Sequence, residues 1–137
     1  MKNDQSENDS TPIYKVILVG EAGVGKTCII HRYIENTFDE NTKNTLGESF
    51  LSKTIEIDDQ VISLEIWDTV GGEKYRSLSK IFFNGSSAVI FVYDITKLKT
   101  FEELKNYWYQ KIKEEFGINI GKIYFFKNYF SFWSCCK

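Results

Sequence analysis

Apolar and polar positions along this chain repeat with two periods, one typical of strands and the other of helices. Residues 13–20, IYKVILVG, form a short apolar run rich in β-branched residues that ends in glycine, as expected for a strand buried on both faces. Residues 26–36 then carry apolar residues at helical spacing. The pattern therefore predicts a strand, a glycine-containing loop and a helix.

Two alternating runs follow at residues 50–58 and 61–68, separated by Asp59 and Gln60, which predicts a β-hairpin with a tight turn. Helical spacing returns at residues 75–83, and residues 87–94 are typical of another buried strand. Residues 100–116 are predicted to form an amphipathic helix that Thr100 caps. Strands that alternate with helices predict an α/β fold with a mainly parallel sheet, to which the hairpin adds one antiparallel edge strand.

The two ends of the chain differ in composition from the middle. Residues 1–12 are polar and mixed in charge, which predicts a disordered segment before a single domain at residues 13–116. Residues 117–137 are an atypical tail rich in aromatic residues. Within the tail, residues 122–126, KIYFF, are placed to pair with strand 87–94 as a fifth, parallel strand and so to cover an exposed apolar edge. A disordered or collapsed tail is the alternative.

The overall composition narrows the class of protein. With 42% hydrophobic residues, 26% charged residues and a net charge of −2, the chain has no basic excess, and we expect no nucleic-acid partner. Cys28 and the adjacent pair Cys135 and Cys136 do not make a disulfide framework, which favours a reducing compartment. The polar N-terminus lacks a signal-peptide core, and no uncharged run approaches the ~20 residues that span a bilayer. We expect a cytoplasmic protein, or one attached to a membrane from the cytosolic side.

Residues 20–27, GEAGVGKT, match the pattern G-x-x-x-x-G-K-[ST] between a buried strand and a helix. Gly20, Gly23 and Gly25 allow backbone N–H groups to surround a phosphate, and the helix N-terminus adds partial positive charge. Lys26 is expected to contact the β- and γ-phosphates, and the Thr27 hydroxyl to bind Mg²⁺. The alternative is a glycine turn that only happens to precede a helix.

A phosphate loop of this kind needs a second anchor for magnesium, normally an acid at the end of a neighbouring strand. Asp68 ends the run LEIWD and meets that requirement. Residues 37–50 lie between the loop and this strand pair, and their polar, glycine-containing sequence predicts a mobile loop over a nucleotide. Thr45 within it is a candidate second hydroxyl for the metal.

Together these segments resemble the small GTPases of the Ras superfamily, and within it the Rab branch, over residues 13–116. GEAGVGKT is similar to the family's phosphate loop, NTLGESF to its first switch, WDTVGGEKYRSL to its second switch, and VYDIT to the strand end that follows. The run FFNGSSAVIFVYDIT and Trp67 resemble Rab sequences in particular. The resemblance implies a P-loop NTPase fold of the small GTPase type, and a GTP/GDP switch with Mg²⁺ that acts in vesicle and membrane traffic.

The resemblance also implies a role for individual residues. Phe38 would pack against the guanine, Thr45 would bind Mg²⁺ and sense the γ-phosphate, and the Gly71 N–H would bond to that phosphate. A core position for Phe38 and a solvated loop hydroxyl at Thr45 are the alternatives. The expected nucleotide-binding residues are Gly20, Glu21, Ala22, Gly23, Val24, Gly25, Lys26, Thr27, Cys28, Phe38, Thr45, Asp68 and Gly71, with Thr27, Thr45 and Asp68 as metal ligands.

Departures from the family pattern shape the expected activity. Gly72 stands where the family has a glutamine that orients the attacking water, so we expect slow GTP hydrolysis and assign no catalytic residue. Ala22 occupies a crowded loop position, and Val70 replaces the usual alanine beside the γ-phosphate. The N-K-x-D loop that reads guanine and the later S-A-K loop do not occur, so we expect a truncated chain whose fold is incomplete at the C-terminus.

The expected partners follow from the same resemblance. They are exchange factors, GTPase-activating proteins and effectors, with Trp67 in an effector-facing patch unless it is a core residue. SCCK resembles the double-cysteine terminus on which Rab proteins carry geranylgeranyl groups, and lipidated Cys135 and Cys136 would hold the protein on the cytosolic face of endomembranes. We expect plain thiols there, with lipidation as the alternative. Two rival functions remain: a non-enzymatic remnant that acts through partner contacts, and a phosphate binder without base selectivity.

Overall fold

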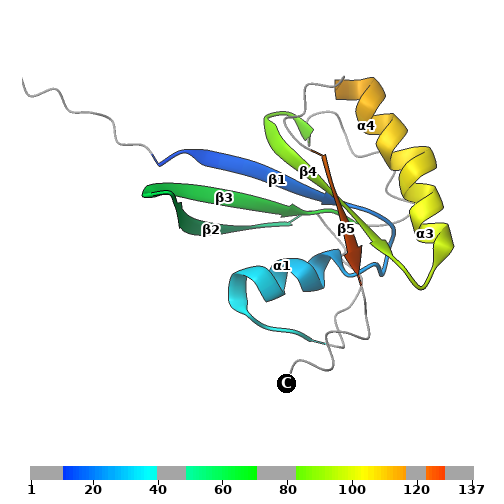
Figure 1. Cartoon of the computed structure of the whole chain (residues 1–137), viewed down its shortest axis with the longest axis horizontal. Helices are drawn as coiled ribbons and strands as arrows, with labels where there is room; N and C mark the ends of the chain where they lie inside the picture. The colour runs from blue at the N-terminus through cyan, green and yellow to red at the C-terminus, as the bar shows by residue number, and fades with distance from the viewer. Residues whose placement is uncertain (1–10, 40–48, 71–82, 117–122, 129–137) are drawn as a thin grey trace, which may run out of the picture.

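The computed structural model describes residues 11–39, 49–70, 83–116 and 123–128, which form a five-stranded sheet with helices on both faces (Figure 1). On one of these faces, a π-helical segment, η2, joins the helices α3 and α4 into one continuous helical rod. In chain order the elements are β1 (Ile13–Val19), α1 (Lys26–Glu35), β2 (Ser49–Ile57), β3 (Gln60–Asp68), β4 (Ser86–Asp94), α3 (Leu98–Glu103), η2 (Leu104–Trp108), α4 (Tyr109–Phe116) and β5 (Ile123–Asn128).

The strands lie in the order β2-β3-β1-β4-β5, with β2 antiparallel to β3 at one edge and the other neighbours parallel. The predicted α/β fold with a mainly parallel sheet and one antiparallel edge strand is confirmed. Leu18 pairs with Asp68 of β3, and Val19 pairs with Phe91 of β4, so the carboxyl ends of β1, β3 and β4 meet at one edge of the sheet. Open α/β sheets bind ligands at such an edge.

The fifth strand confirms the pairing predicted for the KIYFF run. β5 runs parallel to β4, with Val89 opposite Ile123 and Asp94 opposite Asn128. It begins one residue later than predicted and continues two residues further. A disordered or collapsed tail is therefore wrong for residues 123–128, while residues 129–137 lie outside the described residues. Strand β4 is paired along both of its edges, which suits its largely buried, apolar sequence.

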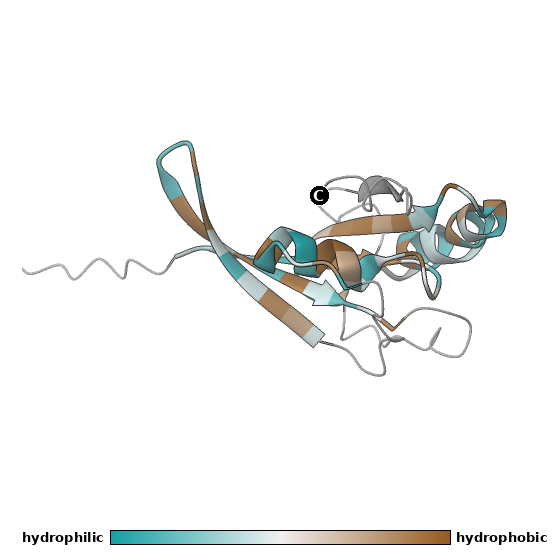
Figure 2. Cartoon of the chain, turned by 90° about the horizontal axis from the view of Figure 1, so that it is seen from below, coloured by the Kyte–Doolittle hydropathy of each residue, from teal (hydrophilic) through white to brown (hydrophobic). Residues whose placement is uncertain are grey.

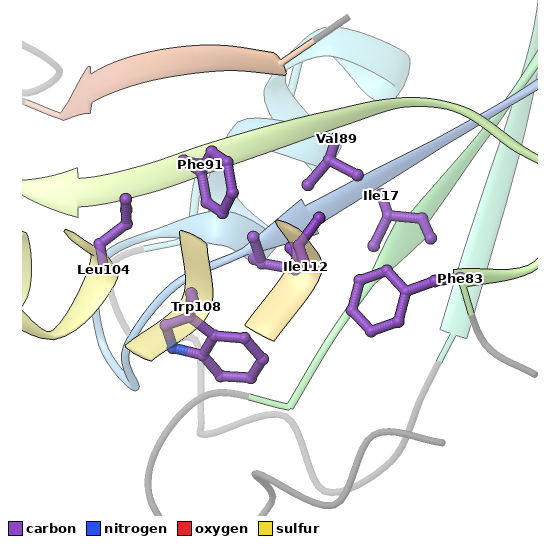
Figure 3. Packing of buried hydrophobic residues seen from close by; sticks show 8 residues of the cluster. Ile17, Phe83, Val89, Phe91, Leu104, Trp108 and Ile112 are labelled. Carbon is purple, nitrogen blue, oxygen red and sulfur yellow. The ribbon is translucent and has the colours of Figure 1, made fainter. Parts of the chain in front are cut away.

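Alternate side chains of the parallel strands point to opposite faces, so each face of the sheet has its own core. One core packs strand residues against the α3–η2–α4 rod (Figure 3) and comprises Ile17, Val19, Phe83, Val89, Phe91, Leu104, Trp108 and Ile112. The other packs β1, β3 and β4 against the phosphate-loop side and α1 and comprises Leu18, Val24, Ile30, Ile66 and Val92. Figure 2 shows apolar residues along the strands and polar residues at the hairpin tip.

The hairpin turn differs by one residue from the prediction. The turn residues are Asp58 and Asp59, because Ile57 still pairs with Gln60. Both aspartates have positive φ, 50° and 63°, which is what a two-residue type I′ turn requires at its central positions. Aspartate tolerates this left-handed backbone better than glutamine does, and the turn therefore falls on the Asp-Asp pair.

The predicted cap of the long helix is wrong. The helix begins at Leu98 with Lys97 at its N-cap, so Thr100 lies inside the first turn. The Thr100 hydroxyl accepts a hydrogen bond from the Asp94 N–H at 3.0 Å and donates to the Lys97 carbonyl at 2.8 Å. The Asp94 carboxylate accepts bonds from the Thr96 N–H and hydroxyl, at 2.9 Å and 2.6 Å. These bonds turn the chain directly after β4 and start the helix two residues early.

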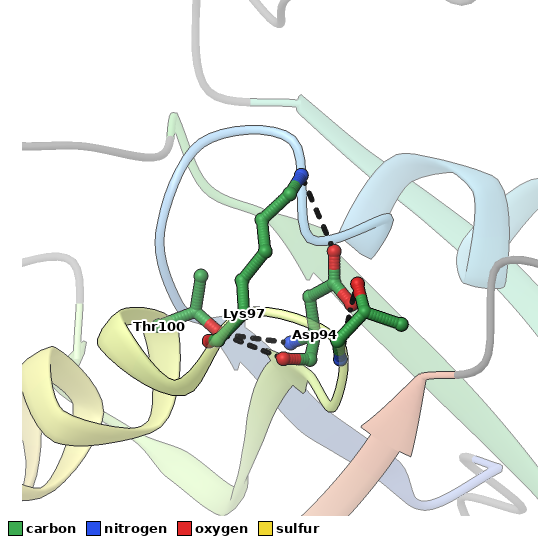
Figure 4. A network of polar contacts seen from close by, with 4 residues as sticks. Asp94, Lys97 and Thr100 are labelled. Atoms are coloured by element: carbon green, nitrogen blue, oxygen red, sulfur yellow. Dashed lines mark hydrogen bonds and ion pairs between the residues drawn. The ribbon is translucent and has the colours of Figure 1, made fainter.

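Asp94 is the centre of this polar network (Figure 4). It is buried at the end of β4, and Lys97 Nζ lies 3.3 Å from its Oδ2 atom. Burial alone would raise the pKa of Asp94, but the hydrogen bonds from Thr96 and the hydrogen bond and charge of Lys97 outweigh it and lower the pKa below its usual value. The ionised carboxylate therefore stabilises the turn between β4 and α3.

We expect Asp94→Ala to lower the free energy of unfolding at pH 7 by about 2 kcal/mol, because the Thr96 N–H and hydroxyl lose a charged acceptor. Since the folded-state pKa of Asp94 lies below the unfolded value, its contribution is present above about pH 4 and is lost as pH falls through the folded pKa. Urea unfolding of wild type and Asp94→Ala at pH 7 and pH 3 measures this contribution. An equal loss of stability in both proteins on acidification would contradict it.

Candidate phosphate and magnesium site

The loop between β1 and α1 depends on its first glycine. A Cβ atom at Gly20 would lie 2.2 Å from the Val92 carbonyl oxygen of β4, so no larger residue fits there. Gly23 and Gly25 have φ values of 74° and 90°, and Gly25 is the N-cap of α1. The loop therefore needs glycine at the positions where the sequence pattern has it.

The loop is anchored at its ends and open in the middle. Val24 is buried against Ile30 and the strands of the α1-side core, and the Ile29 N–H donates to the Gly25 carbonyl at 3.0 Å in the first turn of α1. Ala22 and Gly23 are exposed. The exposed part thus lies next to the N-terminus of α1, where backbone N–H groups and the helix dipole favour an anion.

Lys26 is held inside the loop. Its side chain is buried, and Nζ donates to the carbonyl oxygens of Gly20 at 2.9 Å and Glu21 at 3.0 Å. Burial lowers the pKa of the Lys26 ammonium from 10.5 to about 8, although the charges of Asp68 and Glu21 act in the opposite direction. At neutral pH Lys26 is therefore a positioned cation that lacks the full hydration of a surface lysine.

The structure brings together two of the three predicted magnesium ligands. The Thr27 hydroxyl at the start of α1 donates to Asp68 Oδ2 at the end of β3, at 2.6 Å. Asp68 is 3% exposed, so its charge lies in a largely desolvated position. A hydroxyl and a carboxylate are the hard oxygen donors that Mg²⁺ prefers, and the pair fits this metal. Thr45, the third predicted ligand, lies outside the described residues.

Two further residues, outside the predicted set, support this site. Thr69 is fully buried, and its hydroxyl donates to the Leu18 carbonyl at 2.7 Å, which ties the chain after Asp68 to the end of β1. A hydroxyl directly after the strand-ending acid was a usable signal. The Trp108 indole N–H donates to Glu21 Oε1 at 3.3 Å across 87 residues of sequence, and no local pattern indicates that contact.

For the remaining predicted residues, the structure gives a position in the fold and a degree of burial. Cys28 lies half-buried in α1 directly after Thr27, and Phe38 lies half-buried in the segment after α1, where its contact with guanine stays a prediction. Val70 is buried directly after Thr69.

Among the described residues, no helix is long and apolar enough to cross a membrane. The predicted residues outside the described ranges are Thr45, Gly71, Gly72, Cys135 and Cys136.

Trp67 packs against the core and also belongs to a partly exposed aromatic pair, and its place in an effector-facing patch stays a prediction. Its half-buried ring packs against the core beneath the α3–η2–α4 rod. The ring also stacks on Phe50 of β2, with centroids 5.0 Å apart and planes 20° apart, and Lys15 Nζ lies 4.4 Å from the ring centroid. Phe50 is 50% exposed, so the Phe50–Trp67 pair presents aromatic surface at the end of the hairpin.

Comparison with known proteins gives consistent matches. The sequence model of the Ras family matches residues 15–125. Ras-related protein Rab-22A of Homo sapiens is 43% identical over 106 residues, which cover 77% of this chain and 54% of that protein. RABG3b of Arabidopsis thaliana is 42% identical over 95 residues (69% and 47%), and Rab-8A of Bos taurus is 37% identical over 111 residues (81% and 53%). The chain spans about half the length of these curated relatives.

The close approach of the loop to β4 predicts unequal costs for two glycine substitutions. Gly20→Ala should lower the free energy of unfolding by about 3 kcal/mol or more, because its methyl group would collide with the Val92 carbonyl. Gly23→Ala is the matched control: it has no neighbour within 4 Å, and its positive φ should cost only about 1 kcal/mol. Thermal or urea unfolding compares the two, and equal costs would contradict the packing argument.

Proposed function

Because this chain belongs to the Ras family, we propose that it is a Rab-like GTP-binding switch with GTPase activity that acts in vesicle and membrane traffic. One observation carries the proposal: the Thr27 hydroxyl and the Asp68 carboxylate lie 2.6 Å apart at the carboxyl edge of the sheet, beside the buried ammonium of Lys26. This combination supplies oxygen ligands for a divalent cation and a positive charge for phosphate oxygens.

In this proposal each loop residue has a defined task. The backbone N–H groups of residues 22–25 and the α1 N-terminus would surround the phosphates. The Lys26 ammonium would form hydrogen bonds and ion pairs with the phosphate oxygens. The Thr27 hydroxyl donates a hydrogen bond to Asp68, which leaves the lone pairs of its oxygen available to a cation. Thr27 and Asp68 would hold Mg²⁺, which neutralises phosphate charge when bound. Asp68 is kept in place by the chain around it, because Thr69 is bonded to β1.

The switching part of the proposal concerns the segments that flank the hairpin. Thr45 and Gly71 would be tied to the γ-phosphate and released on hydrolysis, so that effectors meet two different surfaces. The Phe50–Trp67 pair supports an effector surface here. Phe50 lies at the start of β2, which follows residues 40–48 in sequence, and Trp67 lies near the end of β3, which precedes residues 71–82 in sequence. Exposed aromatic residues are typical anchors of protein interfaces.

The proposed partners and location follow from the family. In the cytoplasm an exchange factor would replace GDP by GTP, a GTPase-activating protein would speed GTP hydrolysis, and effectors would bind the GTP-bound form. We expect no nucleic-acid partner. It would act at the cytosolic face of endomembranes, with stable lipid anchoring only if Cys135 and Cys136 are prenylated. Two chains anchor a protein stably where one does so only marginally.

The nucleotide proposal is tested by the affinities of purified protein for GDP, GTP and ATP, each with Mg²⁺ and with EDTA. We expect tighter binding of both guanine nucleotides than of ATP, and at least tenfold weaker Mg²⁺-dependent binding in Thr27→Val, since that variant loses the hydroxyl bonded to Asp68. Thr54→Val, an exposed threonine of β2, is the control and should bind like wild type. Equal affinity for ATP would favour the phosphate binder without base selectivity, and absence of binding would favour the non-enzymatic alternative.

A second experiment addresses hydrolysis. Gly72 has no side chain with which to orient the attacking water, so Gly72→Gln should speed single-turnover GTP hydrolysis on the order of 10²-fold, because phosphoryl transfer depends chiefly on positioning. GTP affinity is measured in parallel, so that a change in binding is not taken for a change in chemistry. A hydrolysis rate no faster than that of wild type would refute this explanation of slow turnover.

A further inference from the structure

One contact joins the phosphate loop to the helical rod on the opposite face of the sheet. The indole Nε1–H of Trp108 donates to Glu21 Oε1 at 3.3 Å, although the two residues are 87 positions apart. Glu21 is the second residue of the loop, and its backbone carbonyl accepts the bond from Lys26 Nζ at 3.0 Å. Glu21 therefore connects a core tryptophan to the ammonium that we assign to the phosphates.

The donor in this contact is held rigidly. Trp108 is fully buried among Phe91, Leu104 and Ile112 (Figure 3). The Tyr107 ring packs edge-on against it, with ring centroids 5.2 Å apart. A side chain enclosed in this way has few rotamers available, so its N–H has a fixed position before any ligand arrives.

The helix is irregular where it presents this tryptophan. The Tyr109 N–H donates to the Leu104 carbonyl, five residues back, which defines the π-turn η2 (Leu104–Trp108). A π-turn holds more residues than an α-helical turn and changes the direction of the side chains that follow it. Such turns are unfavourable and are frequent at functional sites. Here the π-turn ends at the residue that contacts the loop.

The acceptor carries a charge that is a problem for phosphate binding. A glutamate inside the loop repels phosphate if its carboxylate swings toward the ligand, yet the same charge supports the ammonium of Lys26. A carboxylate held on the side of the loop that faces the α3–η2–α4 rod stays away from the phosphates and still supports the Lys26 ammonium. The Trp108 N–H lies where it holds the carboxylate in that place.

We propose that Trp108 is a positioning residue for the phosphate loop: its indole N–H fixes the Glu21 carboxylate against the α3–η2–α4 rod and so sets the Glu21 carbonyl and Lys26 for the nucleotide phosphates. This inference rests on the proposed nucleotide binding. It assigns to the helical rod, and to its π-turn, a part in ligand affinity in addition to its part in the core.

The test is a double-mutant cycle on the rate of Mg²⁺–GDP release from the full chain. Trp108 is replaced by phenylalanine and, in a second protein, by β-(3-benzothienyl)alanine, which has nearly the shape of tryptophan but no N–H. Each replacement is made in wild type and in Glu21→Ala, which removes the acceptor. Tyr109→Phe is the control, since it removes a polar atom from the same core and keeps the ring that packs against Phe91.

We expect loss of the N–H to speed GDP release about tenfold in wild type, as for a lost hydrogen bond to a charged group, and less than about twofold in Glu21→Ala, where the N–H has no acceptor to hold. Tyr109→Phe should release GDP like wild type. No acceleration with the benzothienyl residue, or equal acceleration in both backgrounds, would overturn the proposal, because the effect would then be absent or due to packing.

A spectroscopic readout separates this inference from the proposed function. The indole N–H resonance that disappears in Trp108→Phe identifies Trp108, and in Glu21→Ala it should shift as its acceptor is lost. A resonance that does not move would overturn the hydrogen bond. A wild-type protein that binds neither GDP nor GTP would refute the proposed function, whereas normal GDP binding with unchanged release in the Trp108 variants would refute only the role of Trp108.

Discussion

The site depends on how closely the end of β1 passes β4. At Gly20 the backbone lies so near the Val92 carbonyl that a single methyl group would collide with it. This closeness lets the chain leave the sheet at Gly20, turn through the loop and enter α1 within a few residues. Three strand ends therefore converge on a small volume, and the residues that follow them come within hydrogen-bond distance: Thr27 and Asp68 at one side, Lys26 and the loop carbonyls at the other.

The convergence has an electrostatic consequence. Lys26, Asp68 and Glu21 lie in a partly or largely desolvated place, and the attraction of the Lys26 ammonium for the two carboxylates offsets part of the cost of its burial. Lys26 meets its hydrogen-bonding needs with carbonyl oxygens of the loop itself. The loop is thus closed around its own lysine, and this arrangement already places a positive charge for an anion.

How much of this was predictable depends on the range of the interaction. Buried strands, the glycine loop and the parallel fifth strand follow from short periodic runs, because each run responds mainly to local burial. The turn at Asp58 and the helix start at Leu98 were each missed by one or two residues, since φ preferences and the bonds of Asp94 decide them and periodicity does not. The contact of Trp108 has no local signal because its partner Glu21 is distant in sequence, whereas Thr69 follows the strand-ending Asp68 directly and only its bond to Leu18 is long-range. The sequence pattern thus predicts the proximity of Lys26, Thr27 and Asp68 that the structure has, but it does not predict the long-range contacts of Thr69 and Trp108.

Strand β5 has a consequence for the loop that its own sequence does not suggest. It pairs with β4 along Val89 to Asp94, and Phe126 stands opposite Val92, the residue whose carbonyl limits the space at Gly20. Strand β5 therefore supports β4, and β4 is the strand against which the loop packs at Gly20. Local unfolding of β5 would expose the hydrogen-bonding edge of β4 and would also remove the strand that supports Val92. Loss of order at this edge of the sheet would therefore make the phosphate loop less rigid.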